Sequence, residues 1–435
     1  MTNWKEILKD VRPGMLEGDL EIRFVQPLLA ELGFDPPKFK KDKQFKKGPL
    51  TAKPDYACWQ DPPDPPDSSP PTLVVEAKAV TEGNGWAEKA IEQVEREMLA
   101  AKARFGLITN GLQIQLFQRH GKICVPRTRL QDVTVATIQG IIDTVKANLA
   151  KPRRALTVMF WNNKGGVGKT TITGNIGAAL AKKGVKVLLV NFDLQGDLNH
   201  MFDFEGVSSY QAPLTIHEAL KDAELGIGKA DFGQLVRSKT FEVGGSGFAG
   251  TGLFASASSY SLDVIPGDMS MKEVEKRKFV KSESLKRLLK QGLYDKYDYI
   301  LIDASPSWEG IAKLAAIAAD AIVPIVDNSS FAIDALERLR NDYLADMPDD
   351  TSLPPKIAGY IINSRFQIKS TVEGSIERIK ERIEEKTGLK PTSWIVPNYA
   401  EIERATESGK PVVYGRPNGA AAKKFVELAD LIFSE

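Results

Sequence analysis

Cysteine and histidine are scarce in this chain, which has two cysteines and three histidines among 435 residues. Two cysteines cannot build a disulfide framework, and their scarcity fits a reducing compartment. Three widely spaced histidines argue against a Cys/His zinc site and against a histidine-based hydrolase. No run of about 18 apolar residues occurs, so we expect no membrane span. The first ten residues lack an apolar stretch, so we expect no signal peptide and a cytoplasmic protein.

An excess of charge of one sign is also lacking, because 58 Lys and Arg balance 57 Asp and Glu. A nucleic-acid partner would therefore need a local basic patch. At roughly 100–200 residues per domain, the length predicts two or three domains. The composition changes near residue 151, where a fresh strand and glycine-rich loop begin. We predict an N-terminal domain over 1–150, a basic linker over 151–156 and a C-terminal domain over 157–435.

The strongest signal is the glycine-rich segment KGGVGKTT, which follows a strand pattern and precedes a helix pattern. Such a turn aims backbone N–H groups at one point, where the helix dipole also favours an anion. Lys169 would reach the β- and γ-phosphates of a nucleotide, and the Thr170 hydroxyl would sit on Mg²⁺. The predicted phosphate-binding residues are Gly165, Gly166, Val167, Gly168, Lys169, Thr170 and Thr171.

Continuously apolar, β-branched runs such as VKVLLV, YILID, AIVPIV and IAGYII are typical of strands buried on both faces of a parallel sheet. Asp193 and Asp303 lie at the ends of two such runs. Ligands of open α/β sheets bind beyond the carboxyl ends of the strands. We therefore expect Lys169, Asp193 and Asp303 to meet at one edge. The predicted fold class is α/β, with a C-terminal P-loop NTPase whose mostly parallel sheet is flanked by helices.

The loop departs from the standard P-loop, because Asn163 stands at its first glycine position and an extra lysine, Lys164, precedes Gly165. With this deviant Walker A pattern, residues from about 155 to 435 resemble the ParA/MinD family of dimerising ATPases. The resemblance implies an ATP-sandwich homodimer in which Lys164 reaches the partner's site. Whether a partner protein stimulates hydrolysis stays open at this point. In the second family motif, Asn191 replaces an aspartate.

The same resemblance assigns four further roles. It implies that Asp193 positions the attacking water and that Asp303 lies near Mg²⁺. Asn363 would contact adenine, and Pro397 would flank it. The cofactors implied for this part are ATP and Mg²⁺.

The N-terminal part carries a second constellation. Asp55 opens a short strand pattern, and a buried strand pattern over 72–80 contains Glu76 and Lys78. Residues i and i+2 of a strand point the same way, so Glu76 and Lys78 share a face, with Asp55 beside them. Two carboxylates and a lysine suit metal-dependent phosphodiester hydrolysis. Asp55 and Glu76 would bind Mg²⁺ or Mn²⁺, and Lys78 would orient water or stabilise charge.

Further patterns surround this trio. Glu17 is a candidate acid on an amphipathic helix over 16–34, and another helix is predicted over 86–106. Residues of about 15–120 resemble the N-terminal nuclease domain of type I restriction enzyme motor subunits and similar PD-(D/E)xK domains. An α/β restriction-endonuclease-like fold is thus expected. The family often has Gln followed four residues later by Tyr, whereas here Gln93 is followed by Glu97. A basic run over 38–48 could bind a phosphate backbone.

The expected function is an ATP-dependent dimerising ATPase that controls a metal-dependent DNA endonuclease, which would suit defence against foreign DNA such as phage. Two alternatives stay open. One is a partition or positioning ATPase whose N-terminal domain only binds DNA or a partner, and the other is a metabolic ATPase of the same superfamily. A pure partition protein needs none of Asp55, Glu76 and Lys78. The expected partners are a second copy and DNA, without a membrane.

Overall fold

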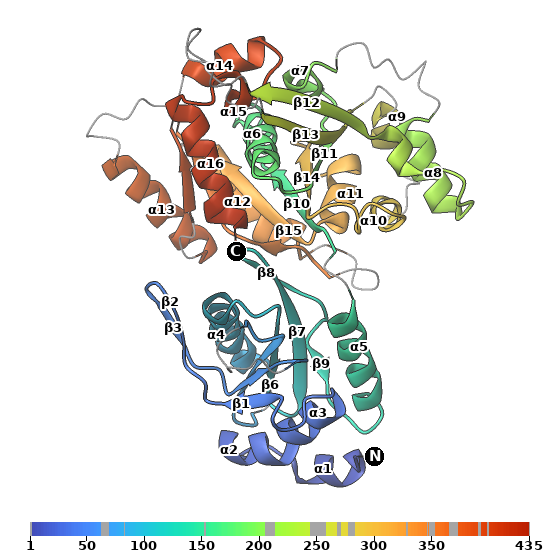
Figure 1. Cartoon of the computed structure of the whole chain (residues 1–435), viewed down its shortest axis with the longest axis vertical. Coiled ribbons are helices and arrows are strands. Elements are labelled where there is room, and N and C mark those ends of the chain that lie inside the picture. Colours follow the sequence, from blue (N-terminus) through green and yellow to red (C-terminus); the bar gives the residue numbers. More distant parts are fainter. Residues whose placement is uncertain are drawn as a thin grey trace, which may run out of the picture. The chain divides into compact units, whose positions relative to one another are not determined.

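The chain, seen here as a computed structural model, divides into two compact units: Met1–Pro152 with Phe433–Glu435, and Arg153–Ile432 (Figure 1). Of the predicted linker, residues 152 and 153 lie outside the described residues. No helix in the described part is both long and apolar enough to span a membrane. The structure describes residues 2–61, 69–81, 83–151, 154–204, 214–243, 258–267, 271–276, 283–327, 329–345, 347, 353–364, 373–389, 393–397 and 400–434.

The smaller unit is built on a mixed sheet with the order β1-β4-β5-β6-β7-β8, and β9 pairs with β7. Only β5 and β6 pair in parallel, and the other described pairs of this sheet are antiparallel. A separate hairpin joins β2 and β3. The strands are β1 (Phe39–Lys41), β2 (Phe45–Lys47), β3 (Leu50–Ala52), β4 (Tyr56–Cys58), β5 (Leu73–Ala77), β6 (Phe105–Thr109), β7 (Gln113–His120), β8 (Ile123–Pro126) and β9 (Gln131–Asp132).

Apolar side chains cover both faces of this sheet. Successive residues of a strand point to opposite faces, and Val75 belongs to one apolar cluster whereas Val74 belongs to the other. The helix α4 supplies Val94 and Met98 to the second cluster. The predicted helix over 16–34 forms as three consecutive pieces, with one π-helical turn in the middle. The helices are α1 (Trp4–Asp10), α2 (Glu17–Leu20), η1 (Glu21–Val25), α3 (Gln26–Glu31), α4 (Gly85–Ala101) and α5 (Ile138–Ala150).

The larger unit contains a sheet with the order β12-β13-β11-β14-β10-β15-β17-β18, and β16 pairs with β15. Its described pairs are parallel apart from the antiparallel pair of β12 and β13. The predicted α/β class with a mostly parallel sheet is confirmed. The strands are β10 (Leu156–Trp161), β11 (Val187–Phe192), β12 (Arg237–Val243), β13 (Ser258–Ile265), β14 (Tyr299–Ala304), β15 (Ala321–Val326), β16 (Lys356–Ile357), β17 (Tyr360–Asn363) and β18 (Ser393–Val396).

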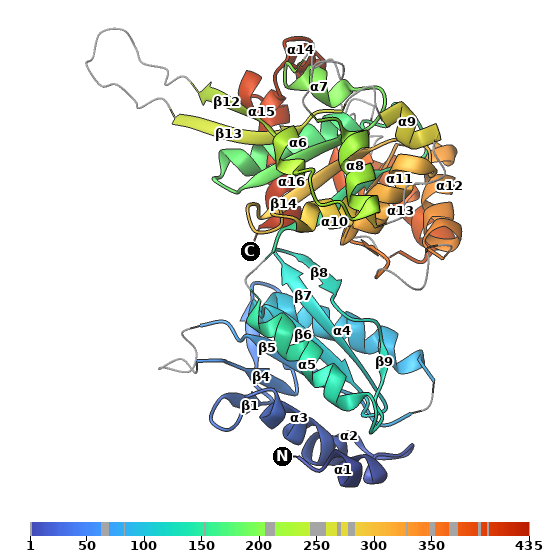
Figure 2. The ribbon, with the colours of Figure 1, turned by 90° about the vertical axis from the view of Figure 1, so that its right-hand side faces the viewer.

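Helices flank this sheet (Figures 1 and 2). The helix α6 packs closely on β11, because a Cβ atom at Gly177 would lie 2.6 Å from the Leu189 side chain. This close approach fixes the helix that follows the glycine-rich loop. The helices are α6 (Lys169–Lys182), α7 (Asp197–Met201), α8 (Ile216–Leu225), η2 (Phe232–Leu235), α9 (Met271–Lys276), α10 (Ser284–Lys290), α11 (Gly310–Ala318), α12 (Ser330–Arg338), η3 (Leu339–Tyr343), α13 (Glu373–Thr387), α14 (Ala400–Glu407), α15 (Val412–Gly415) and α16 (Ala420–Phe433).

Candidate functional sites

The glycine-rich loop turns tightly between β10 and α6. Gly166 and Gly168 have φ values of 70° and 94°, a conformation that side chains with a Cβ rarely adopt. A Cβ atom at Gly168 would also collide with the Asn363 side chain. The loop therefore needs glycine at position 168 for two reasons. Its backbone lies at the N-terminus of α6, where the free N–H groups and the helix dipole favour an anion.

Buried charges gather beside this loop. Lys169 is 5% exposed, and its ammonium donates to the carbonyl oxygen of Lys164 at 3.4 Å. Burial lowers the pKa of Lys169, and the carboxylates of Asp303 and Asp193 oppose that shift. Asp303 lies in β14, fully buried, and neither of its carboxylate oxygens has a hydrogen-bond partner among the described residues. Burial raises its pKa well above the usual carboxyl range, although the nearby Thr170 hydroxyl opposes the shift. Buried oxygens left without partners fit a divalent cation.

Asp193 follows β11 in a turn that is held by side-chain amides. Its backbone N–H donates to Asn191 Oδ1 at 3.0 Å, and its carboxylate accepts from the backbone N–H of Gln195 at 3.0 Å. The Asn191 amide then donates to Asn199 Oδ1 at 2.9 Å, and Asn199 donates to the Gly267 carbonyl at 2.7 Å. The asparagine that replaces an aspartate thus builds a neutral network that fixes the start of this turn.

Asn363 and Pro397 lie at neighbouring strand ends. Asn363 ends β17 opposite Val396 of β18, and Pro397 follows directly. The Asn363 amide donates to the carbonyl of Val167 at 2.8 Å, so it contacts the glycine-rich loop itself. The structure therefore brings both residues to the same edge of the sheet as Lys169.

Lys164 is held by its own chain in this structure. Its ammonium lies 2.6 Å from Asp327 Oδ2 and 2.9 Å from Ser329 Oγ. Asp327 is 2% exposed. Burial by itself would raise the pKa of Asp327, but hydrogen bonds from Lys164 and Ser329 outweigh it and lower that pKa. In this structure the charge of Lys164 is therefore paired with a buried carboxylate of its own chain.

In the smaller unit, the structure brings the predicted trio together. Asp55 directly precedes β4, and its Oδ2 accepts from the backbone N–H of Ala77 at 2.7 Å. Glu76 lies in β5, which pairs with β4, and its Oε1 is paired with the Lys78 ammonium. Glu17 also approaches, with its Oε2 at 4.0 Å from Lys78 Nζ. The expectation that Glu76 and Lys78 share a face is confirmed.

The carboxyl groups of this site are unusually hard to ionise. Burial raises the pKa of Asp55 to about 7, and the neighbouring Glu76 adds to the shift. Burial likewise raises the pKa of Glu76 to about 8, and Lys78 opposes the shift. Because a divalent cation would neutralise these carboxylates, the donor set fits Mg²⁺ or Mn²⁺, both of which prefer oxygen ligands.

Two acids that the sequence analysis did not assign to the site also lie here. Glu21 has a carboxylate oxygen within 4.8 Å of those of Glu17 and Asp55, and Lys41 pairs with it at 3.0 Å. Glu97 of α4 is 1% exposed and affects the pKa of Glu76. Glu21 could have been found as the residue four positions after Glu17 on one helix face. Glu97 could have been found as an acid within an apolar helix stripe.

Comparisons with known proteins give a separate match for each of the two units. Residues 155–345 match the family model of an AAA domain, and residues 22–124 match that of the type I restriction enzyme R protein N terminus. The sporulation initiation inhibitor protein Soj of Bacillus subtilis is 28% identical over 276 residues, which cover 62% of this chain and 96% of Soj. The chromosome partitioning protein ParA of Caulobacter vibrioides is 27% identical over 299 residues, covering 66% of this chain and 96% of ParA.

A solved structure supports the fold of the same part. The ATP complex of a McdA variant from Cyanothece aligns with 65% of this chain and 98% of its own, with 19% identity and a TM-score of 0.50. The larger unit has the fold of the P-loop NTPases and resembles the ParA/MinD ATPases in sequence, so we call it the ParA/MinD-like unit. At that identity the structural likeness speaks for the fold alone.

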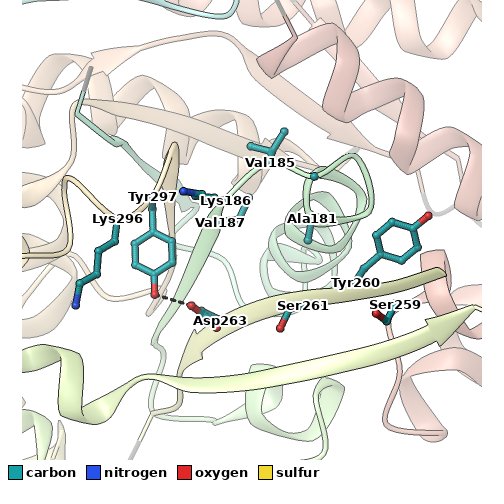
Figure 3. Close-up of a pocket in the computed structure, with 11 residues that line it drawn as sticks. Ala181, Val185, Lys186, Val187, Ser259, Tyr260, Ser261, Asp263, Lys296 and Tyr297 are labelled. Atoms are coloured by element: carbon teal, nitrogen blue, oxygen red, sulfur yellow. Dashed lines mark hydrogen bonds between the residues drawn. The ribbon is translucent and has the colours of Figure 1, made fainter. Parts of the chain in front are cut away.

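The ParA/MinD-like unit also has a cavity of about 450 Å³ away from the glycine-rich loop (Figure 3). Lys186 and Val187 line it at the start of β11, and Tyr297 lines it just before β14. The Tyr297 hydroxyl donates to Asp263 Oδ2 at 2.7 Å. The cavity therefore lies at the amino ends of the strands, opposite the edge where ligands of such sheets bind. It is not part of the nucleotide site.

Proposed function

We propose that this protein is an ATPase that dimerises on binding ATP and thereby controls a metal-dependent DNA nuclease site. One observation carries the proposal: a single chain holds both a P-loop charge cluster and a partly buried Asp55/Glu76/Lys78 cluster. The matches to an AAA domain and to a restriction enzyme N terminus support the two halves. Cleavage of foreign DNA, as in phage defence, would be a use for such a protein.

In the ATPase half, the loop amides and Lys169 bind the β- and γ-phosphates. Thr170 and Asp303 hold Mg²⁺, which neutralises phosphate charge when bound. Asp193 positions the attacking water, and its turn is braced by Asn191. Asn363 and Pro397 frame the base. Support comes from the convergence of these residues on one sheet edge.

Lys164 acts between two copies. ATP hydrolysis requires positive charge on the γ-phosphoryl oxygens, and a partner subunit can provide it. In the proposed cycle, ATP binding makes Lys164 leave Asp327 of its own chain. The Lys164 ammonium then contacts the phosphate of the ATP that is bound to the other subunit. The ion pair of Lys164 with the buried Asp327 at 2.6 Å supports this, because it keeps the half-exposed lysine close to the loop before the exchange. A stimulating partner protein would act on this step.

In the nuclease half, Asp55 and Glu76 hold the divalent cation. When bound, the cation would lower the pKa of a water molecule and polarise the scissile phosphate. Lys78 keeps the Glu76 carboxylate oriented and stabilises negative charge on the phosphate. A single site of this type cuts one strand, so a double-strand break needs two sites, which a dimer supplies at high effective concentration.

The deciding experiment is incubation with plasmid DNA and Mg²⁺ or Mn²⁺, with and without ATP, beside Glu76→Ala. We expect cleavage by the wild type with metal, more double-strand cutting with ATP, and no cleavage by Glu76→Ala. A wild type that binds DNA but never nicks it in any nucleotide state would refute the nuclease half.

A second candidate is a partition or positioning ATPase whose N-terminal unit only binds DNA or a partner. The named relatives favour it, because one is a chromosome partitioning protein. In that case Glu76→Ala and the wild type would bind DNA equally and neither would cut it.

A further inference from the structure

Glu97 faces the predicted nuclease site from α4. Glu76 and Glu97 are each 1% exposed. One oxygen of each is occupied, because Glu97 Oε1 accepts from the Gln93 amide at 3.2 Å and Glu76 Oε1 is paired with Lys78. The other oxygen of each, Oε2, is buried and has no hydrogen-bond partner among the residues that the structure describes. The two carboxyl groups lie within hydrogen-bonding range of each other, so without a cation between them one of the two must carry a proton.

Packing gives no reason for an acid at this position. The buried face of α4 is otherwise apolar, with Ala90, Val94, Met98 and Ala101 against the sheet. A leucine or methionine would fill position 97 without a desolvation cost, whereas a buried carboxylate with one oxygen left without a donor is expensive. A residue that is costly for folding and lies beside a catalytic cluster points to a ligand that compensates the cost.

The site also holds more carboxyl groups than cations. The carboxyl groups of Glu76 and Glu97 lie close enough that each changes the pKa of the other, and Asp55 also acts on Glu97. Lys78 is the cation that pairs with Glu76, and its charge can neutralise only one of these three carboxylates. A divalent cation bound by Glu76 and Glu97 would neutralise the remaining charge and would supply the partner that their Oε2 atoms lack.

We propose that Glu97 is a ligand of the same divalent cation as Glu76, so that the ion is held between β5 and α4. This inference rests on the metal-dependent site proposed above and extends its ligands beyond Asp55 and Glu76. The ion would be a hard cation such as Mg²⁺ or Mn²⁺, since the donors are carboxylate oxygens. Gln93 is a positioning residue, because its amide orients the Glu97 carboxylate.

The test is Mn²⁺ binding by calorimetry to the full-length protein without nucleotide or DNA. We expect Glu97→Gln to raise the Mn²⁺ Kd at least about tenfold, because a ligand is lost while the side-chain shape is kept. Glu76→Gln should do the same. Glu88→Gln, an exposed acid in the first turn of α4, is the matched control and should bind Mn²⁺ like the wild type.

A second readout separates a lost ligand from a misfolded variant. Without metal at pH 8, Glu97→Gln should unfold at a temperature no lower than the wild type, because a buried charge has been removed. With saturating Mn²⁺, its melting temperature should rise less than that of the wild type.

Two results would overturn the inference in different ways. If Glu76→Gln loses Mn²⁺ affinity and Glu97→Gln keeps it, Glu97 is not a ligand and the proposed site stands without it. If neither variant changes Mn²⁺ binding and the wild type cuts no DNA, the proposed metal site itself is wrong. The role proposed for Glu97 is then wrong as well.

Discussion

The two candidate sites both hold carboxyl groups out of water beside a lysine, but they differ in the groups that surround them. Each buries carboxylates beside one lysine, Lys169 in the ParA/MinD-like unit and Lys78 in the smaller unit. In the first, a glycine-rich backbone loop and parallel strand ends bring the groups to the edge where we propose that phosphate binds. In the second, Asp55 and Glu76 come from an antiparallel strand pair, and the acids outnumber the nearby cations.

This contrast suggests opposite ligands for the two sites. Backbone N–H groups and a buried ammonium are suited to phosphate, and we propose Asp303 as the acid for its accompanying cation. A group of carboxylates with few donors forms a site for a metal ion. The two sites also belong to different units, so a change at one should leave the chemistry of the other intact.

The largest effect should come from Lys169→Ala, which removes the phosphate clamp. We expect ATP turnover to fall at least about 100-fold, since a preorganised charge at the phosphates is lost. Asp193→Ala should instead bind ATP and hydrolyse it slowly, and should accumulate as the ATP-bound dimer. Phosphate release and size-exclusion chromatography measure both, with Lys182→Ala at the far end of α6 as a control. An Asp193→Ala variant that stays monomeric and turns over normally would contradict the role given to Asp193.

Breaking the other site should leave ATP turnover alone. Glu76→Ala and Lys78→Ala should each abolish metal-dependent DNA cleavage, because one removes a cation ligand and the other removes the adjacent positive charge. ATP hydrolysis by both variants should stay within about twofold of the wild type. Plasmid nicking and phosphate release on the same preparations check this. Loss of both activities in a folded variant would mean that the two sites are not separable.

Lys164→Ala should have an intermediate effect, and it tests whether the ATPase unit and the nuclease unit are coupled. We expect the ATP dimer to weaken roughly tenfold, about 1.4 kcal/mol, through loss of the contact between subunits. Double-strand cleavage should then fall far more than nicking. Analytical ultracentrifugation and a plasmid assay with ATP report the two quantities. Equal nicking and double-strand cutting by Lys164→Ala and the wild type would show that the units work independently.

The smallest effect concerns the pH dependence of stability. The pKa values of Asp55, Glu76 and Glu97 are raised by burial to about 7, 8 and 7 in the folded state. Unfolded carboxyl groups titrate near pH 4, so between about pH 4 and 8 the folded state binds more protons than the unfolded state. The free energy of unfolding must therefore decrease as the pH rises through this range.

Thermal unfolding in EDTA measures this loss. The melting temperature of the wild type should fall by several degrees between pH 5 and pH 8, and Glu76→Gln should show a smaller fall. Glu88→Gln, which changes an exposed acid, should follow the wild type. A Glu76→Gln variant with the full wild-type slope would mean that Glu76 is ionised in the folded protein at pH 5.

The α/β class and the position of the glycine-rich loop could be predicted from the amino-acid sequence alone. Both are local properties: buried parallel strands need continuous apolar runs, and a phosphate loop needs glycines between a strand and a helix. The contact of Glu76 with Lys78 was also predictable, because the two-residue period of a strand puts both on one face. These features depend on neighbours along the chain.

Other contacts were decided only by the tertiary structure. Lys164 meets Asp327 across 163 residues, and Asn363 meets Val167 across 196. Glu97 comes to Glu76 because α4 packs on β5, and nothing in the helix sequence indicates which strand that will be. The burial that raises the pKa of these acids is likewise a property of the packed core. Contacts between distant segments depend on which strands and helices lie next to each other in the fold. Local sequence patterns do not specify that arrangement.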